Sequence, residues 1–299
     1  MSPSIHIQHR VQQINAGGPF FHLTISLLLT VFSMFCFGLE EVLANDVSGT
    51  PELLSQPRPR HPDAVNHPLP DGPKNEFHIA RLVFDTNASH GWGPGRPWWR
   101  IDWPEAEHHF INGLQRYTVV DVAPDSVHIE LGDDALFDHP WLFAQQVGRW
   151  QISDTQVEQL GEYLRRGGFL LADDLHGPYD WETFTGVIFR ALPEAAIVDI
   201  PSDDAVMDVL YELDQRTQIP GRRHIMANDG QGNVSVRMPY SPPRWRGIKD
   251  GNGRWIVAIN FNMDMGDSWE HADDPGYPLE MTSLGYRFGI NYVIYAITH

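Results

Sequence analysis

Cysteine is nearly absent from this sequence, which contains only Cys36 among its 299 residues. One thiol cannot close an intramolecular disulfide, so a disulfide framework is excluded. Cys36 lies in an apolar run near the N-terminus, so the rest of the chain also lacks a cysteine nucleophile. The residues before it, Ser33, Met34 and Phe35, are not the small side chains of a bacterial lipoprotein site, so we expect no lipid anchor here.

Positive charge is also scarce. The chain has 21 Lys and Arg residues against 39 Asp and Glu residues, which gives a formal net charge of −18. Binding to nucleic acid relies on clustered cations that neutralise phosphates, so we expect no nucleic-acid partner. An acidic balance is typical of a soluble surface, although some of the carboxylates could converge on a metal ion or a polyol.

A G-x-S-x-G motif is missing as well, and with it a serine nucleophile of the hydrolase type.

Residues 20–39 contain no Asp, Glu, Lys or Arg and lie between Arg10 and Glu40. The small-residue pattern that ends at Ala44 completes an export signal over residues 1–44. The alternative is an uncleaved anchor, because about 20 apolar residues can span a bilayer. Either reading predicts an exported protein, periplasmic or on the extracytoplasmic face of the membrane. This N-terminal segment is then the only expected membrane contact.

Residues 45–75 contain seven prolines among polar residues, without an apolar period. This composition predicts an extended linker. The remainder, residues 76–299, is predicted to form one α/β domain.

Strand and helix patterns alternate along that domain. Ser153 and Gln156 match a capping box, and Gly167 is expected to end the helix that they begin. Gly285 and Gly289 are expected to let the last helix lie close to the sheet. The alternation predicts a three-layer α/β fold with a mostly parallel sheet. The expected strands are 79–84, 119–122, 127–131, 141–145, 169–172 and 195–200, followed by a hairpin of 244–248 with 255–261. Two helices are expected to begin at residues 104 and 153, and two more are expected to span 181–192 and 280–297.

Three of the expected strands end in similar sets of carboxylate, imidazole and indole side chains. Because parallel strands end at one edge of a sheet, we expect these sets to line one cleft, where ligands bind in such folds. The segment 91–103 between two of them contains four tryptophans and either covers a core edge or forms a binding platform. Its Arg100 and Asp102 could orient a carboxylate or a hydroxyl. The candidate ligand-binding residues are Asp85, His90, Trp92, Trp99, Arg100, Asp173, Asp174, His176, Asn262 and Asp264.

These residue types suit three kinds of chemistry. Carboxylate oxygens and imidazole nitrogens bind divalent metal ions. Carboxylates beside indole rings suit a sugar, and a pair of carboxylates can act as general acid and base. The structural alternative is that the aspartates cap helices, as Asp180 would do for the helix that follows it, and that the tryptophans pack in the core. The sequence assigns no catalytic residue and no metal ligand, and leaves a divalent metal ion open as a cofactor.

From Phe77 to Thr298 the chain resembles the bacterial family called domain of unknown function 4159. The resemblance rests on blocks in a set order: Arg81 and the strand to Asp85, Trp103 to Glu107, Tyr117-Thr118, Leu160 to Asp174 with its G-G-F-L-L-A-D-D core, Asn260 to Asp264, and Leu284 to Tyr295. That family is similar to the class I glutamine amidotransferase-like superfamily, which implies a flavodoxin-like three-layer fold. Amidotransferases of that superfamily use a Cys-His-Glu triad, so cysteine-dependent glutaminase chemistry is excluded for this chain.

Three functional hypotheses follow. The leading one is an exported cell-envelope domain that binds a ligand or serves as a scaffold, without the catalysis of that superfamily. The second is a metal- or carboxylate-dependent hydrolase of envelope carbohydrate, with Asp173 and Asp174 as bases or ligands. The third is a membrane-tethered partner in a protein complex, indicated by the linker and the aromatic segment. The expected partners are therefore a small molecule or carbohydrate, or proteins of the envelope.

Overall fold

A mostly parallel β-sheet forms the centre of the computed structural model, which describes residues 77–86, 97–213, 216–226, 235–237, 239–240 and 242–299. Within these residues, seven strands make up the sheet, and the first five in spatial order run parallel to one another. In spatial order they are β3 (Val127–Glu130), β1 (Ala80–Val83), β4 (Trp141–Gln145), β6 (Phe169–Leu175), β11 (Trp255–Phe261), β10 (Arg244–Lys249) and β7 (Val198–Asp199).

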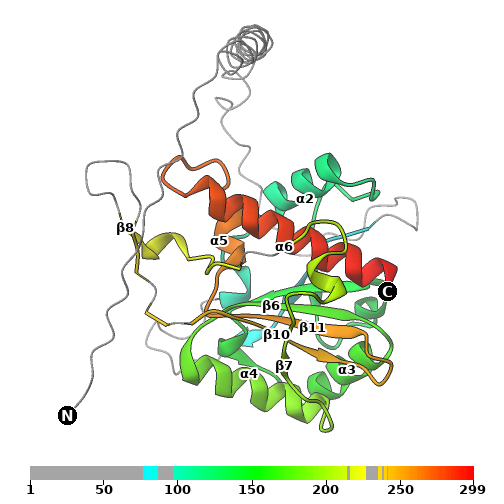
Figure 1. Ribbon diagram of the computed structural model, residues 1–299. Helices are drawn as coiled ribbons and strands as arrows, with labels where there is room; N and C mark the ends of the chain where they lie inside the picture. The colour runs from blue at the N-terminus through cyan, green and yellow to red at the C-terminus, as the bar shows by residue number, and fades with distance from the viewer. Residues whose placement is uncertain (1–76, 87–96, 214–215, 227–234, 238, 241) are drawn as a thin grey trace, which may run out of the picture. The chain divides into compact units, whose positions relative to one another are not determined.

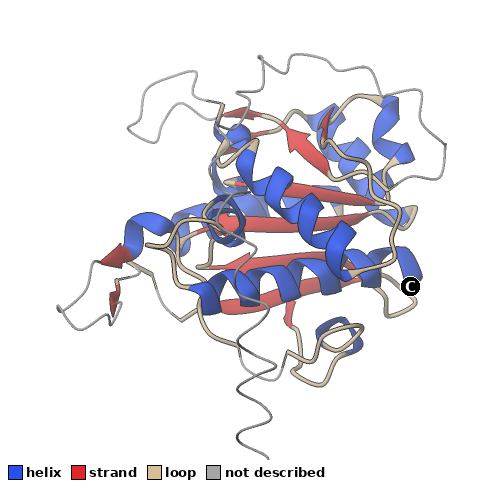
Figure 2. Cartoon of the chain, turned by 90° about the horizontal axis from the view of Figure 1, so that it is seen from above, coloured by secondary structure: helices blue, strands red, loops and turns tan. Residues whose placement is uncertain are grey.

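The antiparallel end of the sheet comes from the predicted hairpin. β10 pairs antiparallel with β11, and β7 pairs antiparallel with β10. Gly253 has a φ of +86° in the connecting turn, a conformation that favours glycine. Figure 2 shows the strands running side by side, with the C-terminus at the end of the last helix.

Two helical layers enclose the sheet, with α2, α5 and α6 over one face and α3 and α4 over the other (Figure 1). Phe169 and Leu171 of β6 belong to the first core, whereas Leu170 and Ala172 belong to the second. This alternation is expected of a strand covered on both faces. The expected three-layer α/β fold is confirmed and is consistent with a flavodoxin-like architecture. The helices are α2 (Glu105–Tyr117), α3 (Asp154–Arg165), α4 (Gly177–Ala191), α5 (Met265–Glu270) and α6 (Leu279–Thr298).

Short elements complete the described part of the chain. β2 (Asp85–Thr86) pairs with β5 (Trp150–Gln151), and β8 (Ile225–Met226) pairs with β9 (Ser235–Val236). The 3₁₀ helices are η1 (Trp98–Arg100), η2 (Asp134–Asp138), η3 (Val147–Arg149), η4 (Ala205–Met207) and η5 (Arg222–His224). None of the helices in the described part combines the length and the hydropathy needed to cross a membrane. The predicted export signal, the whole predicted linker, residue 76 of the predicted domain, His90 and Trp92 lie outside the described residues.

The α3–β6 unit has the ends that the sequence predicts. The backbone N–H of Gln156 donates to Oγ of Ser153 at 3.3 Å, and Oε1 of Gln156 accepts from the Ser153 backbone at 3.0 Å. Gly167 then ends the turn with a φ of +97°. β6 continues past the predicted Ala172 to Leu175, because its backbone keeps partners on β4 and β11.

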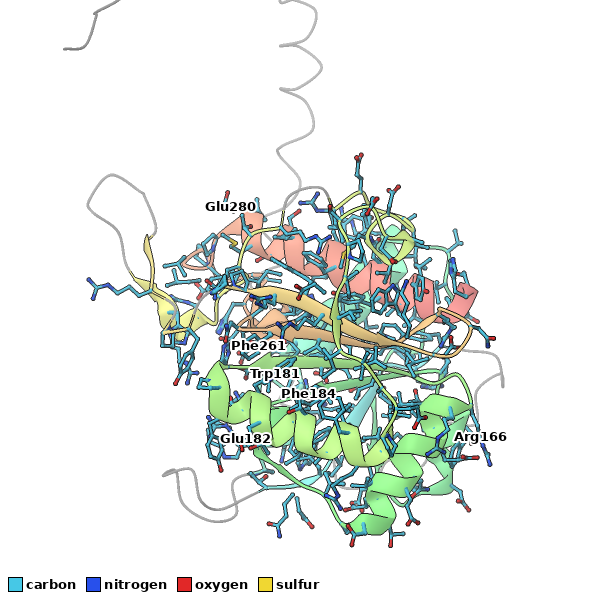
Figure 3. All side chains as sticks on the ribbon, turned by 60° about the horizontal axis from the view of Figure 1, so that its bottom comes forward. Arg166, Trp181, Glu182, Phe184, Phe261 and Glu280 are labelled. Carbon is cyan, nitrogen blue, oxygen red and sulfur yellow. The ribbon has the colours of Figure 1, made fainter. Side chains whose placement is uncertain are left out.

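Aromatic side chains fill the space between α4 and the sheet. Trp181 meets Phe261 of β11 with ring centroids 4.9 Å apart and Phe184 of its own helix at 6.4 Å (Figure 3). The start of α4 is thereby held against the end of β11.

The two glycines of α6 act differently from the prediction. A Cβ on Gly285 would collide with Ser268, and one on Gly289 would lie 2.6 Å from Cζ2 of Trp269. These glycines therefore bring α6 close to α5, whereas the sequence pattern favoured contact with the sheet. The ring of Trp269 in turn stacks on Phe110 of α2, with centroids 4.1 Å apart and planes at 10°.

Two expected strands are wrong or shortened. Residues 119–122 form no strand: Val119 is fully exposed, and only Val122 reaches the sheet, through an isolated bridge to Phe77. The run of β-branched residues directly follows α2, and the outer edge of β1 is already paired with β3. The strand expected at 195–200 is limited to Val198–Asp199. Within the described residues it pairs with β10 only through Asp199 with Arg246 and Val198 with Gly247.

Replacement of the buried ring that supports α5 tests this packing. We expect Phe110→Ala to lower the free energy of unfolding by about 3–5 kcal/mol, because it leaves a cavity beneath Trp269. Tyr117→Ala, at an exposed aromatic residue of the same helix, should change it by less than about 0.5 kcal/mol. Chemical denaturation followed by circular dichroism measures both, and equal effects would contradict the packing described.

Candidate functional site

The buried carboxylate of Asp173 connects the end of β6 to the start of α5. Its Oδ2 accepts hydrogen bonds from the backbone N–H groups of Met265 at 2.7 Å and Gly266 at 3.0 Å. The positive end of a helix favours an acceptor at this position. Burial, together with the neighbouring charge of Asp174, raises the pKa of Asp173 to about 7.

Asp174 is turned away from Asp173 by a backbone φ of +52°. Its Oδ1 lies 2.8 Å from Nε2 of His176, and its Oδ2 accepts from the side-chain amide of Gln146. Burial opposes the charge of Asp174, but the hydrogen bonds and charges of His176, Gln146 and Arg223 together outweigh it and lower the pKa of this carboxyl group. Asp174 is therefore held as a carboxylate in the interior.

Asp264 and Asp267 stand at the start of α5. Oδ1 of Asp264 accepts from the backbone N–H of Asp267 at 3.0 Å, which makes Asp264 the N-cap. Oδ2 of Asp267 accepts from the backbone N–H of Arg222 at 2.6 Å. A Cβ at Gly221 would lie 2.8 Å from Oδ2 of Asp264. The glycine therefore leaves space around this carboxylate oxygen that any larger residue would fill.

Asp102 lies beside Asp264 and Asp267, and a buried polar network holds it there. Nε2 of Gln145, at the end of β4, donates to Oδ2 of Asp102 at 2.6 Å. Oε1 of Gln145 accepts from Arg81 at 2.8 Å. Arg81, fully buried in β1, also forms an ion pair with Glu107 of α2 and donates to the backbone carbonyl of Ile101 at 2.9 Å. Arg81 thus holds the segment that carries Asp102 against the sheet.

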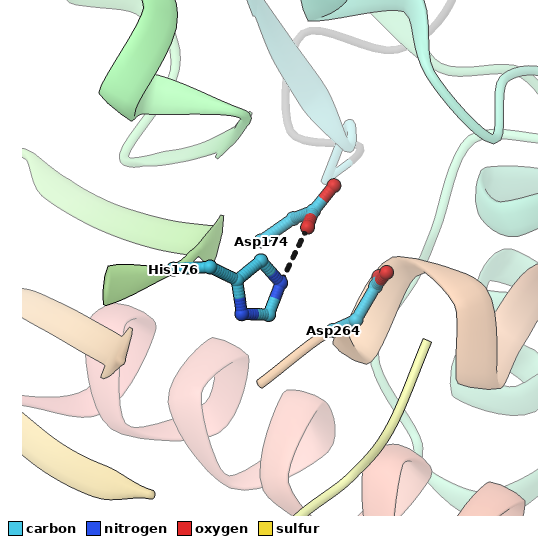
Figure 4. Close-up of side chains that lie close together, drawn as sticks. All are labelled: Asp174, His176 and Asp264. Atoms are coloured by element: carbon cyan, nitrogen blue, oxygen red, sulfur yellow. Dashed lines mark hydrogen bonds and ion pairs between the residues drawn. The ribbon is translucent and has the colours of Figure 1, made fainter. Parts of the chain in front are cut away.

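These side chains form two overlapping triads of metal-ligand type. In the first, one potential ligand atom from each of Asp174, His176 and Asp264 lies within 4.8 Å of the others. The three side chains face a common space at the end of β6 (Figure 4). In the second triad the same holds for Asp102, Asp264 and Asp267. Asp264 belongs to both, so the triads form one centre, which we call the carboxylate centre. A further group on α5, with Asp267, Glu270 and His271, is only half-buried.

Negative charge is concentrated in the carboxylate centre. Burial raises the pKa of Asp102 well above its usual range, and the charges of Asp267 and Asp174 raise it further. Burial also raises the pKa of Asp264, again with added repulsion from Asp174 and Asp267. Arg223 attracts Asp174 from η5, but the guanidinium of Arg222 is paired with Asp274 at 2.8 Å. Buried carboxylates that repel one another favour either protons or a bound cation.

His176 offers an additional unsatisfied group. The residue is 9% exposed, and its Nδ1 is buried with no hydrogen-bond partner in the described part of the chain. The ring nitrogen that faces the carboxylates is Nε2, 2.8 Å from Oδ1 of Asp174, whereas Nδ1 lies on the opposite edge of the ring (Figure 4).

Backbone strain is concentrated here too. Among the described residues, the non-glycine residues with positive φ are Asp102, Gln146, Asp174 and Asn262. The first three belong to the carboxylate centre or bond to it, and Asn262 lies two residues before Asp264. Such conformations cost free energy and occur preferentially at functional sites.

Two of the three predicted strand ends meet. Asp173, Asp174 and His176 from β6 lie beside Asp264, and Asn262 stands next to them. Oδ1 of Asn262 accepts from the backbone N–H of Gly177 at 2.9 Å, so this side chain links β11 to α4. Asp180 was expected to cap a helix that follows it, but α4 already begins at Gly177, and Oδ2 of Asp180 instead accepts from the backbone N–H of His176 at 3.1 Å from within the first turn.

The first predicted strand end does not join the carboxylate centre. Asp85 is exposed in β2, where it pairs with Gln151 of β5. The ring of Trp99 packs against His128, with centroids 5.0 Å apart. The guanidinium of Arg100 lies 4.7 Å over the ring of Trp103. The expectation of one cleft lined by three strand ends is therefore corrected at Asp85: β1 turns into the β2 pairing, which leaves this carboxylate exposed and outside both triads.

Several residues of the site escaped the sequence analysis. Gln145 is the last residue of the predicted strand 141–145 and Gln146 follows it, so a search of this strand end like that of the other strand ends would have found them. Asp102 was expected to orient a carboxylate or a hydroxyl but was not grouped with the strand ends, and the structure places its carboxylate beside those of Asp264 and Asp267. Gly221 carries no local signal, because its role depends on its distance from Asp264 across the fold.

The raised pKa values predict how the stability of the ion-free protein depends on pH. A folded state in which Asp102, Asp173 and Asp264 bind protons more tightly than the unfolded chain becomes more stable as pH falls. We therefore expect Tm to rise as pH is lowered from 8 towards 5, by about 3 °C for each 1.4 kcal/mol of linked free energy or somewhat more.

Calorimetric scans in EDTA measure this dependence. Asp264→Asn keeps a capping oxygen but removes one charge, so it should make the rise smaller, whereas Asp85→Asn at the exposed residue should not. A Tm that stays level or falls over this pH range would show that the carboxylates do not repel one another as described.

Comparison with known proteins gives one match. None of the curated proteins compared with the chain matches it. The family described as Domain of unknown function (DUF4159) matches residues 78–297. That range extends from the start of the sheet to the end of α6 and includes every member of the carboxylate centre. The chain therefore belongs to the DUF4159 family.

Proposed function

We propose that this domain binds a divalent metal ion at the carboxylate centre and uses the ion to hold an oxygen-rich ligand. The observation that carries the proposal is the convergence of Asp102, Asp174, His176, Asp264 and Asp267 from three separate segments into two triads that share one carboxylate. The mutual repulsion of the carboxylates supports it, and Nε2 of His176 faces them. A cation would relieve that repulsion without protonation.

The donor set favours one class of ion. Carboxylate oxygens suit Mg²⁺, Ca²⁺ and Mn²⁺, and an imidazole nitrogen shifts the preference towards transition metals. Mn²⁺ accepts both donor types and is the ion we expect to bind best among these three. Each triad supplies three protein ligands, which leaves coordination positions for water or for an incoming ligand.

Open coordination positions also favour a second function, metal-dependent hydrolysis, in which ion-bound water is the nucleophile. Within this alternative, Asp173 is not supported as a base, because it is fully buried and its Oδ2 already accepts two backbone N–H groups. Asp174 would act as a ligand. We favour binding over hydrolysis. Because the apolar run at residues 20–39 predicts export, we propose that either function takes place outside the cytoplasm.

Asp264→Asn separates metal binding from folding. Asp264 is shared by both triads, so the amide should abolish binding of Mn²⁺ measured by isothermal titration calorimetry on the EDTA-treated protein. The variant should nevertheless have a Tm at or above that of the ion-free wild type, because it removes a repelling charge and keeps the N-cap. For the wild type, Mn²⁺ at about 100 times Kd should add about 2.7 kcal/mol of stability, or roughly 5–10 °C in Tm.

Asp85→Asn is the matched control, since it removes a carboxylate at a predicted strand end outside the centre. It should bind Mn²⁺ as the wild type does. Absence of saturable binding to the wild type, or equal loss in the two variants, would refute the proposed function. Turnover of phosphate, carboxylate-ester or glycoside substrates that is lost in Asp264→Asn would favour the hydrolase instead.

A further inference from the structure

A cavity of about 400 Å³ is lined in part by residues that adjoin members of the carboxylate centre along the chain. Its size is typical of small-molecule sites. It adjoins the centre through the chain itself: Gly177 directly follows His176, and Asn262 lies two residues before Asp264. The cavity is lined by Gly177, Pro178, Trp181, Pro239, Tyr240, Arg246, Phe261 and Asn262.

Aromatic rings and one cation dominate the lining. The ring of Tyr240 rests on Gly177, whose missing Cβ would lie 2.7 Å from that ring, and Tyr240 remains exposed on its other side. The ring of Trp181 packs against those of Phe261 and Phe184, which lie to either side of it in Figure 3. Flat rings around a small cavity suit the stacking of a ligand ring, while Asn262 and the backbone supply polar contacts.

Arg246 gives the cavity its charge preference. Its guanidinium lies 4.7 Å over the ring of Trp181, and its Nε donates to Oδ1 of Asp199 at 3.0 Å. Asp199 is itself largely exposed, so this ion pair is weak. The two terminal nitrogens of Arg246 have no hydrogen-bond acceptor among the described residues. A guanidinium oriented by stacking and open at its ends is suited to bind an oxyanion at two points.

We propose that this cavity binds the ring of an anionic sugar, with Tyr240 and Trp181 against the ring and Arg246 on its carboxylate or phosphate. The inference rests on the proposed function in assigning this sugar to the same site as the metal ion. Sugar hydroxyls are the oxygen-rich groups that a bound ion would hold, and the cavity lies where they would meet it. A neutral sugar would leave the guanidinium without its anion.

The strand offers a matched pair of arginines for the test. Arg244 lies two residues before Arg246 on β10 and also pairs with Asp199, at 3.3 Å, but does not line the cavity. Dissociation constants for D-glucuronate, D-glucose 6-phosphate, D-glucose and inorganic phosphate are measured by calorimetry on the full-length, Mn²⁺-loaded protein. We expect at least one anionic sugar to bind about tenfold or more tightly than glucose and inorganic phosphate.

Arg246→Met should weaken that binding about tenfold, and Arg244→Met less than about twofold. The inference is overturned if no sugar binds, if glucose or inorganic phosphate binds as tightly as the anionic sugars, or if the two arginine variants behave alike. Mn²⁺ binding is recorded separately on each variant. Bound Mn²⁺ without sugar binding contradicts this inference alone, whereas sugar binding without any bound Mn²⁺ contradicts the proposed function and the shared site.

Discussion

The arrangement of the site depends on the pair of hydrogen bonds that Asp173 accepts from the first turn of α5. This carboxylate is fully buried at the end of the central strand, and its bonds to Met265 and Gly266 hold the helix start against the sheet. Since Asp264 and Asp267 stand on that helix start, their positions follow from this contact. The adjacent Asp174 points elsewhere, because its positive φ turns it towards His176. Two consecutive aspartates thus have different roles, one structural and one facing the candidate ion.

Electrostatic repulsion opposes the close approach of these carboxylates in the fold. Asp102, Asp174 and Asp264 are buried, and the charge of Asp174 adds to burial in raising the pKa of both Asp102 and Asp264. The buried ion pair of Arg81 with Glu107, and the amide of Gln145, hold Asp102 in place without neutralising it. An arrangement that is unfavourable without a counter-ion is typical of a binding site for one. The central claim of this account is that a divalent ion is that counter-ion.

The sequence predicted the parts of the fold whose signals are local. The capping box at Ser153, the stop at Gly167 and the apolar run of β6 are each encoded within a few residues, and all are confirmed. Asp85 was grouped with the other strand ends because sequence alone could not show that β1 continues into a pairing with β5. The position of Asp102 depends on contacts between strands far apart in the chain. The role of Gly221 depends on tertiary distance, which no local pattern encodes.

The most direct measurement is a crystal structure of the protein soaked with Mn²⁺, with anomalous scattering recorded at a wavelength that identifies manganese. The account predicts a manganese peak bonded to a carboxylate oxygen of Asp264, at about 2.0–2.6 Å, with further ligands from Asp174 and His176 or from Asp102 and Asp267. A structure without manganese at Asp264 under saturating Mn²⁺, or with the ion bound only at other residues, would contradict it.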